Sequence, residues 1–294
     1  MKNFLIGLLF AMLWASASVA TKFGIQSAPP LILANIRFFF AGIVLLTYAY
    51  ATKKDSSFRL PNGKEWKQLF IFASLNTTIY LGLYVYSMKY AAAGIGSLST
   101  STTPLFIVLF SSWLMGRRPS KAEIWSIVIG MVGIAVATYP LLKTSNTTLT
   151  GLLLLGLSMI SVSFASVYYA RVEWKLPNLL INGWQVTIGG LSLLPITLIF
   201  SDFSEVHPDG RLLYSVLWLG LAVSVIGLIC WFYLLKIDTV KASLYLFLCP
   251  LFGFLYAWWL MDEPITYYTY AGTLLVIFGL YLGQRQKFKK VVEG

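Results

Sequence analysis

A segment of this chain occurs twice, and the second copy follows the first by 146 positions, which puts Pro250 opposite Pro104. The copies read S-L-S-T-S-T-T-P-L-F-I-V-L-F-S-S-W-L-M at Ser97–Met115 and S-L-Y-L-F-L-C-P-L-F-G-F-L-Y-A-W-W-L-M at Ser243–Met261. A shared apolar composition would match many leucines, but it would not align a proline, an initial serine and a final W-L-M. An internal repeat determines the architecture before any local pattern does. We therefore expect two related halves, residues 1–143 and 149–294, within one integrated membrane domain.

The composition assigns the chain to the membrane. Hydrophobic residues make up 58% of the 294 positions and charged residues 11%, whereas soluble domains carry about 25% charged residues. The formal net charge of +11 would suggest a nucleic-acid partner in a soluble protein, but here the basic residues lie in short loops between apolar stretches. The expected partners are the lipid bilayer and a small-molecule substrate, with no nucleic acid. The expected oligomeric state is a monomer, with a homodimer as the alternative.

Ten stretches are long and apolar enough to cross a bilayer as helices, which takes about 20 residues each. They are Phe4–Thr21, Leu31–Ala51, Gln68–Met88, Ala92–Met115, Ile124–Leu142, Thr150–Ala170, Leu179–Phe200, Leu212–Leu235, Ala242–Met261 and Tyr267–Gln284. Each half supplies five. Because an odd number of crossings makes the second half start from the opposite side, the predicted fold is an all-α membrane protein with ten transmembrane helices as two inverted five-helix repeats.

Lysine and arginine collect in alternate loops, and this sets the orientation, because short cytoplasmic loops are enriched in both residues. If the N-terminus lies inside, the outer loops hold only Lys22, Lys89, Lys143 and Arg211 of the 22 basic residues. The sequence therefore predicts a multi-pass protein of a bacterial plasma (inner) membrane with both termini in the cytoplasm.

Several motifs are typical of one transporter family. They are L-W-A-S-A-S-V-A-T-K at Leu13–Lys22, N-I-R-F-F-F-A-G at Asn35–Gly42, S-L-x5-P-L-F in both repeat cores, and L-M-D-E-P at Leu260–Pro264. Together they resemble the EamA family of the drug/metabolite transporter superfamily. The resemblance implies two five-helix repeats, transport of a small molecule, and a central cavity among spans one, three, four, six, eight and nine. The chain departs from the family pattern at Arg117, where an acidic residue commonly follows the first core, while Glu263 is kept after the second.

Arg37 is the one ionisable residue well inside a predicted span. A charge at that depth costs about 2.5–3.5 kcal/mol or more, so a functional role with a specific partner is the default hypothesis. The functional interpretation is bidentate binding of a substrate carboxylate or phosphate. The structural interpretation is that the guanidinium snorkels to the outer interface or bonds neighbouring carbonyls. The sequence leaves both open.

Carboxylates are missing from the middle of the spans, since Glu123, Glu173, Asp202 and Asp262 all stand at span ends. Proton-coupled multidrug transporters of related small families use a membrane-embedded carboxylate that alternately holds a proton and a cation. Exchange of cationic drugs for protons is therefore disfavoured. A facilitator, or coupling through another group, fits the sequence better.

The remaining candidates are polar and aromatic residues inside the spans. Trp14 and Ser18 are one helical turn apart, and Asn76, Tyr80 and Tyr84 form an i, i+4, i+8 stripe. The full set of predicted substrate-binding residues is Trp14, Ser18, Arg37, Asn76, Tyr80, Tyr84, Ser101, Tyr168, Gln185, Trp231 and Tyr245. The alternative for each is packing between helices or a place in an interfacial aromatic belt.

Pro104 and Pro250 hold the same place in the two copies. Proline inside a helix removes a backbone hydrogen bond and kinks it. We predict a pair of hinges that let helix ends open and close, with a fixed bend as the alternative. Gly279 and Gly283 make a G-x3-G spacing that permits close helix approach, and we expect the fifth span of the same chain to pack there.

The function that fits these patterns best is a transporter that moves a small amino-acid-like metabolite, as an exporter or facilitator, by alternating access. Uptake of a nucleotide-like or sugar-like solute is the alternative within transport, and a receptor or assembly protein is the alternative outside it. An intramembrane enzyme would need a carboxylate pair, a metal motif or a positioned Ser/His or Ser/Lys pair. The single His207 lies in a loop, so we expect no catalytic residue, metal site or cofactor.

Overall fold

The computed structural model describes residues 2–52, 56–91, 93–116, 118–144, 148–261 and 266–292, without the side chains of 134, 137, 138, 141–144, 280 and 283–292. Arg117 and the Asp262, Glu263 and Pro264 of L-M-D-E-P lie outside the described residues. Within the described ranges the protein is helical and contains no strand.

Ten long helical segments make up the fold, which confirms the number of helices predicted from the sequence. The uninterrupted ones are α1 (Lys2–Gly24), α2 (Pro30–Thr52), α7 (Lys121–Thr144), α8 (Leu149–Arg171), α9 (Asn178–Phe200) and α14 (Tyr267–Val292). The composite ones are α3 (Gly63–Ala73) with η1 (Ser74–Ile79) and α4 (Tyr80–Ser87), α5 (Ala93–Ser99) with η2 (Thr100–Thr102) and α6 (Thr103–Met115), α10 (Gly210–Leu217) with η4 (Trp218–Gly227) and α11 (Leu228–Ile237), and α12 (Thr239–Leu244) with η5 (Tyr245–Leu248) and α13 (Cys249–Met261). The short η3 (Phe203–Glu205) lies between α9 and α10. Within the described residues, 8 of these segments are long and apolar enough to cross a membrane.

In the composite segments the backbone hydrogen-bond pattern changes at positions that correspond under the 146-residue offset. The segments η1 and η4 are π-helical, while η2 and η5 are 3-10 helices. Pro104 and Pro250 each stand in the first turn of the α-helix that follows the 3-10 turn, not in the interior of one regular helix. Proline is well tolerated there, because the N–H that it lacks has no partner in a first turn. The hinge role of these two prolines stays a prediction.

Serine hydroxyls of the first repeat core bond carbonyls of the second. Ser97 Oγ donates to the Cys249 carbonyl at 2.9 Å, and Ser101 Oγ donates to the Leu246 carbonyl at 3.1 Å. Leu246 lies four residues before Pro250, so its carbonyl lacks the donor that an α-helix would normally provide. The hydroxyl from the neighbouring helix compensates for part of that loss and ties the two cores together.

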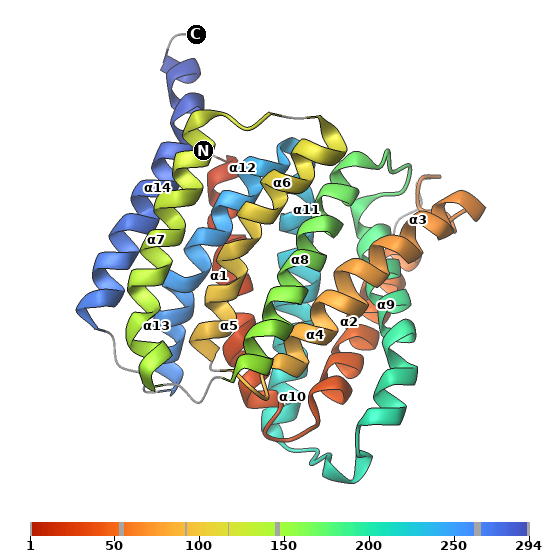
Figure 1. The fold of residues 1–294 in the computed structure, drawn as a ribbon. Coiled ribbons are helices and arrows are strands. Elements are labelled where there is room, and N and C mark those ends of the chain that lie inside the picture. The colour runs from red at the N-terminus through yellow and green to blue at the C-terminus, as the bar shows by residue number, and fades with distance from the viewer. Residues whose placement is uncertain are drawn as a thin grey trace.

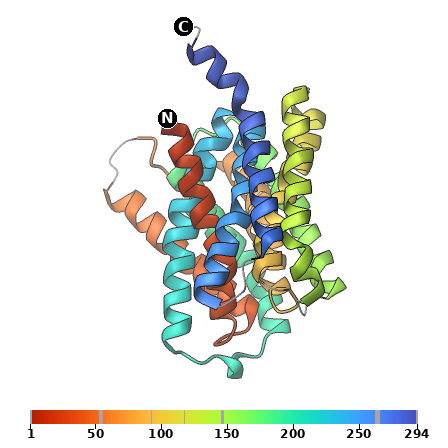
Figure 2. The same ribbon diagram turned by 90° about the vertical axis from the view of Figure 1, so that its left-hand side faces the viewer.

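The helices form one bundle in which α1 begins and α14 ends at the same end (Figures 1 and 2). Helix α1 packs against α13 and η4, while α8 packs against α6 and η1. These two sets of contacts correspond under the sequence offset. Helix α2 packs against α9, and α7 packs along α14 at one side of the bundle (Figure 1).

Glycines allow α7 and α14 to pack closely against each other. A Cβ at Gly133 would lie 2.7 Å from the Gly272 carbonyl oxygen, and one at Gly279 would lie 3.1 Å from the Gly130 backbone nitrogen. The two backbones therefore approach closely, as small residues allow. This confirms that Gly279 packs against the fifth span, while the surroundings of Gly283 lie outside the described part of the chain.

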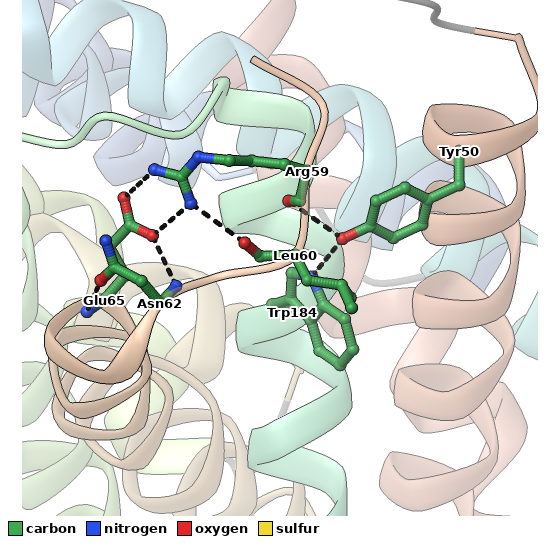
Figure 3. Close-up of polar contacts among 6 residues, drawn as sticks. All are labelled: Tyr50, Arg59, Leu60, Asn62, Glu65 and Trp184. Atoms are coloured by element: carbon green, nitrogen blue, oxygen red, sulfur yellow. Dashed lines mark hydrogen bonds and ion pairs between the residues drawn. The ribbon is translucent and has the colours of Figure 1, made fainter. Parts of the chain in front are cut away.

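A network of polar contacts between the end of α2, the loop before α3 and α9 fixes the turn into α3 (Figure 3). Asn62 and Glu65 form a capping box, with Asn62 Oδ1 accepting from the Glu65 N–H at 3.1 Å and Glu65 Oε2 accepting from the Asn62 N–H at 2.8 Å. Arg59 donates to both oxygens of the same carboxylate at 2.8 and 2.9 Å. Trp184 of α9 donates to the Tyr50 hydroxyl at 3.0 Å, and Tyr50 donates to the Arg59 carbonyl at 3.4 Å. The cap explains why the helix begins at Gly63, ahead of the predicted span.

At the opposite end, Asp209 joins two loops. Its Oδ1 accepts from the Leu212 N–H at 2.9 Å and caps α10, and its Oδ2 accepts from the Ser27 hydroxyl at 2.9 Å. The His207 N–H donates to the Ser27 carbonyl at 2.7 Å. The bonds from the Leu212 N–H first, and from the Ser27 hydroxyl next, lower the pKa of the Asp209 carboxyl below its ordinary value.

We expect the stability that Asp209 confers to depend on pH. Because its pKa is lower in the folded chain, its contribution is complete above the unfolded pKa of about 3.9 and is lost as the pH falls through the folded pKa. In detergent, Asp209→Ala should lower the thermal unfolding midpoint at neutral pH, and the gap to the wild type should close in strong acid. Glu205→Ala in the same loop is the matched control and should show no such gap. A gap that does not change with pH would contradict a role for the charge.

Candidate functional site

Five buried aromatic rings form a continuous row through the bundle. Trp231 of α11 stacks on Phe10 of α1 with ring centroids 4.8 Å apart, and Phe10 contacts Trp14 at 5.3 Å. Trp14 stacks on Tyr80 of α4 at 6.4 Å, and Tyr80 contacts Tyr84 at 6.1 Å. All five side chains are less than 10% exposed, so they line the interior and do not belong to an interfacial belt.

A small cavity lies beside this row. It is lined by Phe10, Trp14, Tyr80, Thr100, Thr103, Val162, Trp231 and Leu246. Thr100 begins the 3-10 turn η2, and Thr103 begins α6 directly before Pro104. The volume is about 10 Å³, roughly enough for one water molecule. Both halves contribute to the walls, so the cavity lies at the boundary between them.

Neutral side chains form a second buried cluster, the amide network of Asn76, Thr77, Asn182, Gln185 and Ser224. Gln185 Oε1 accepts from Asn76 Nδ2 at 3.3 Å and from the Thr77 hydroxyl. Gln185 Nε2 donates to Asn182 Oδ1 at 3.2 Å, and Asn182 Nδ2 donates to the Ser224 carbonyl at 2.9 Å. Two amides of α9 thereby connect η1 of the first half with η4 of the second.

Arg37 of α2 is attached to this network at Ser224. Its Nε and one terminal nitrogen donate to Ser224 Oγ at 3.3 and 3.1 Å, and its guanidinium lies 5.4 Å from the Phe38 ring. The residue is only 1% exposed. The guanidinium is thus held inside the bundle by a hydroxyl, and it does not extend to the interface.

The structure divides the predicted stripe of Asn76, Tyr80 and Tyr84. Asn76 lies in η1 and bonds Gln185 of α9, whereas Tyr80 and Tyr84 follow in α4 and belong to the aromatic row. A π-helical turn closes hydrogen bonds over five residues instead of four. Residues four apart on either side of it therefore no longer share one face.

Four other predicted residues are found apart from the cavity. Ser18 Oγ donates to the Ala15 carbonyl of its own helix at 3.1 Å, and Ser101 bonds Leu246 as described. Tyr168 lines an open vestibule between the start of α3 and the end of α8. Tyr245 packs beside Phe4 near the start of α1, with ring centroids 6.4 Å apart.

The vestibule has a volume of about 570 Å³ and is lined by polar and charged side chains, among them Gln68, Tyr168, Arg171, Glu173 and Lys175. Next to it the rings of Phe72, Tyr169, Trp174 and Phe232 form the aromatic cluster, with centroids 4.6 to 5.9 Å apart. Along the third helical segment the order is Gln68, Phe72, Tyr80. The aromatic cluster therefore separates the vestibule from the central cavity.

Sequence reasoning missed several of these residues. Phe10 lies one helical turn before Trp14, which was a usable signal. Thr100 and Thr103 precede the repeat proline within a hydroxyl-rich run that the sequence displays openly. Asn182 and Ser224 gave no signal, because single amides and hydroxyls in apolar helices are common packing residues.

Comparisons with known proteins agree on one family. The model of the EamA-like transporter family matches residues 1–139 and again residues 149–283. The chain is similar to an uncharacterized transporter, YoaV, of Bacillus subtilis, with 24% identity over 92% of each chain. It is also similar to an uncharacterized inner membrane transporter, YedA, of Escherichia coli, with 25% identity over 95% of this chain and 90% of that protein.

A solved crystal structure has the same fold. It matches with a TM-score of 0.78 and 21% sequence identity, and the match covers 97% of both chains. At this level of identity the likeness concerns the fold alone.

We expect Gln185→Ala to destabilise the bundle, because it leaves the buried groups of Asn76, Thr77 and Asn182 without their partner. The loss should be about 1–2 kcal/mol, measured as a lower unfolding midpoint in detergent. Thr187→Ala on the same helix is the matched control, since the Thr187 hydroxyl donates to the Gly183 carbonyl of its own helix. Equal effects of the two variants would contradict a structural role for the amide network.

Proposed function

The chain belongs to the EamA-like transporter family, and from this premise we propose that it moves a small amino-acid-like metabolite across a bacterial inner membrane by alternating access. The protein acts as an exporter or facilitator, with both termini in the cytoplasm. The two halves are inverted five-helix repeats that rock around a site between them. The small cavity between the aromatic row and the Thr100–Thr103 turn is that site in its collapsed state.

The observation that carries this proposal is that both halves line the cavity. Phe10, Trp14 and Tyr80 come from the first half, and Trp231 and Leu246 from the second. A rocking motion between the halves changes the volume of such a site directly. Aromatic faces and hydroxyls are suited to a solute that is partly apolar and partly hydrogen-bonding.

The contact pattern supports inverted halves. Helix α1 contacts α13 as α8 contacts α6, and α1 contacts η4 as α8 contacts η1. The irregular turns η1 and η4, like η2 and η5, occupy corresponding positions in the two halves. Paired changes of helix type give each half a place to bend.

The aromatic cluster supports access that alternates between two sides. The vestibule lies between the start of α3 and the end of α8, and Phe72, Tyr169, Trp174 and Phe232 lie between it and the cavity. A site that is closed toward this vestibule and collapsed at its centre is one state of such a cycle.

We predict that Tyr80→Ala cuts transport about tenfold, because it removes ring contacts with Trp14 and Tyr84, each worth about 0.5–1.5 kcal/mol, and a tenfold change corresponds to about 1.4 kcal/mol. The measurement is efflux from proteoliposomes preloaded with a mixture of labelled amino acids. Tyr270→Ala is the matched control, since Tyr270 is 63% exposed on α14 and should leave efflux unchanged. Normal efflux by the Tyr80 variant, at equal reconstitution, would assign the aromatic row to packing alone.

A second prediction concerns coupling. Among the described residues that line the cavity there is no Asp, Glu or His, so no wall residue exchanges protons near neutral pH. Efflux should therefore saturate with solute and should not respond to an imposed pH gradient. Accumulation of solute against its gradient when protons flow would refute the facilitator and would require a coupling group elsewhere.

A further inference from the structure

We propose that Arg37 is the anion-binding subsite of this transporter, and that it takes the single carboxylate of the solute while the rest of the solute occupies the aromatic cavity. This rests on the proposed transport function and deepens it by naming the substrate class as monocarboxylates, zwitterionic amino acids included.

The Arg37 guanidinium uses few of its hydrogen-bond donors. An arginine offers five N–H groups in a planar fork, and in the described part of the chain the hydrogen bonds of Arg37 all end on the single hydroxyl of Ser224. At 3.3 and 3.1 Å these bonds are long for a charged donor, which prefers about 2.7–2.9 Å to a carboxylate. A hydroxyl held by two donors is a weak substitute for the two oxygens that fit the fork.

The charge of Arg37 is not balanced by the protein as far as the chain is described. No Asp or Glu of that part lies within ion-pair distance of it, and the amide network to which it is attached is neutral. A buried ion without a counter-ion is strongly unfavourable, yet the residue is 1% exposed. An anion brought by the solute supplies the missing charge.

One positive charge selects a monoanion. A carboxylate carries one negative charge, whereas a phosphate monoester carries about −1.5 to −2 at neutral pH. The bound carboxylate leaves the site neutral, while a phosphate would bury an uncompensated negative charge. The amide network offers no second cation to correct this. Charge balance therefore favours a carboxylate over a phosphate.

The π-helical turn η4 connects the two subsites. It carries Ser224, the partner of Arg37, and three residues later Gly227, where an added Cβ would lie 3.6 Å from the Trp14 ring that lines the cavity. A solute with its carboxylate on Arg37 therefore reaches the faces of Trp14 and Trp231 with the rest of its structure. These faces accept an apolar group, and they also accept an ammonium through cation–π attraction.

Two π-helical turns flank the proposed site. Ser224 lies within η4, and Tyr80 of the cavity wall directly follows η1, where its N–H bonds the carbonyls of Leu75 and Thr77. Such turns are frequent at functional sites. The carboxylate replaces the Ser224 hydroxyl on the guanidinium, and η4, which carries Ser224, adjusts when it binds.

The direct test compares four ligands that share an isopropyl group and differ at the polar end, on the wild-type protein in detergent: L-valine, 3-methylbutanoate, L-valinamide and 2-methylpropyl phosphate. Binding is read from the concentration dependence of the thermal unfolding midpoint. We expect L-valine and 3-methylbutanoate to bind at least about tenfold more tightly than L-valinamide, and the phosphate to bind no better than the carboxylates. L-valine ahead of 3-methylbutanoate identifies an ammonium subsite on the aromatic faces. Equal binding of acid and amide, tighter binding of the phosphate, or no binding by any ligand overturns the proposal.

Variants test whether Arg37 causes the preference for an acid over an amide. Arg37→Lys keeps the charge but loses the planar fork, so carboxylate binding should weaken about tenfold while the preference for acid over amide survives. Arg37→Gln should abolish that preference, and Arg211→Gln, at an exposed arginine in the first turn of α10, should keep the wild-type values. If Arg37→Gln does not fold, the wild-type ligand comparison and the Arg37→Lys variant decide the matter alone.

Efflux of the same solutes separates this inference from the proposed function. Carboxylate-selective binding without any flux from proteoliposomes would leave the Arg37 site in place and remove the transport proposal. Flux of L-valine and L-valinamide at equal rates would leave transport in place and remove the Arg37 site.

Discussion

Lipid gives the backbone no hydrogen-bond partner, and this requirement governs the whole bundle. At three of the irregular turns of the described spans, a side chain from a neighbouring helix bonds a carbonyl. Ser101 bonds Leu246 in η5 before Pro250, Ser161 Oγ bonds the Leu75 carbonyl in η1 at 2.7 Å, and Asn182 bonds the Ser224 carbonyl in η4. These three turns are therefore fixed by contacts from other helices. These turns are therefore also places where two helices are joined by hydrogen bonds.

The polar side chains of the interior lie where they can bond these turns. Helix α9 carries Asn182 and Gln185 three residues apart, so both amides point to one side and each reaches a π-helical turn from a different half. A bundle held by apolar packing alone would slide easily between registers. Amides that must stay paired restrict the bundle to arrangements in which both turns keep their partners, which gives the halves a limited set of relative positions.

The sequence predicted the parts of this structure that depend on composition and periodicity. Long apolar runs identified ten helices, and the repeat located Pro104 and Pro250 at corresponding junctions. Trp14, Tyr80 and Trp231 line one small cavity, and their role in substrate binding stays a prediction. The π-helical turn at η1 was beyond reach, because it has no residue signature, and it removed Asn76 from the stripe. The sequence also did not show how deep in the bundle each aromatic residue lies. Tyr168 and Tyr245 were candidates for the cavity, but Tyr168 lines the vestibule and Tyr245 packs beside Phe4.

The aromatic cluster has a consequence for the temperature dependence of turnover. A solute that passes between the central cavity and the vestibule must part the rings of Phe72, Tyr169, Trp174 and Phe232, and vestibule water then wets their faces. Exposure of apolar surface to water raises the heat capacity. The passage barrier accordingly has an enthalpy that grows with temperature, and a plot of log rate against inverse temperature should curve where passage limits the cycle. A channel with a permanently wet opening would give a straight line.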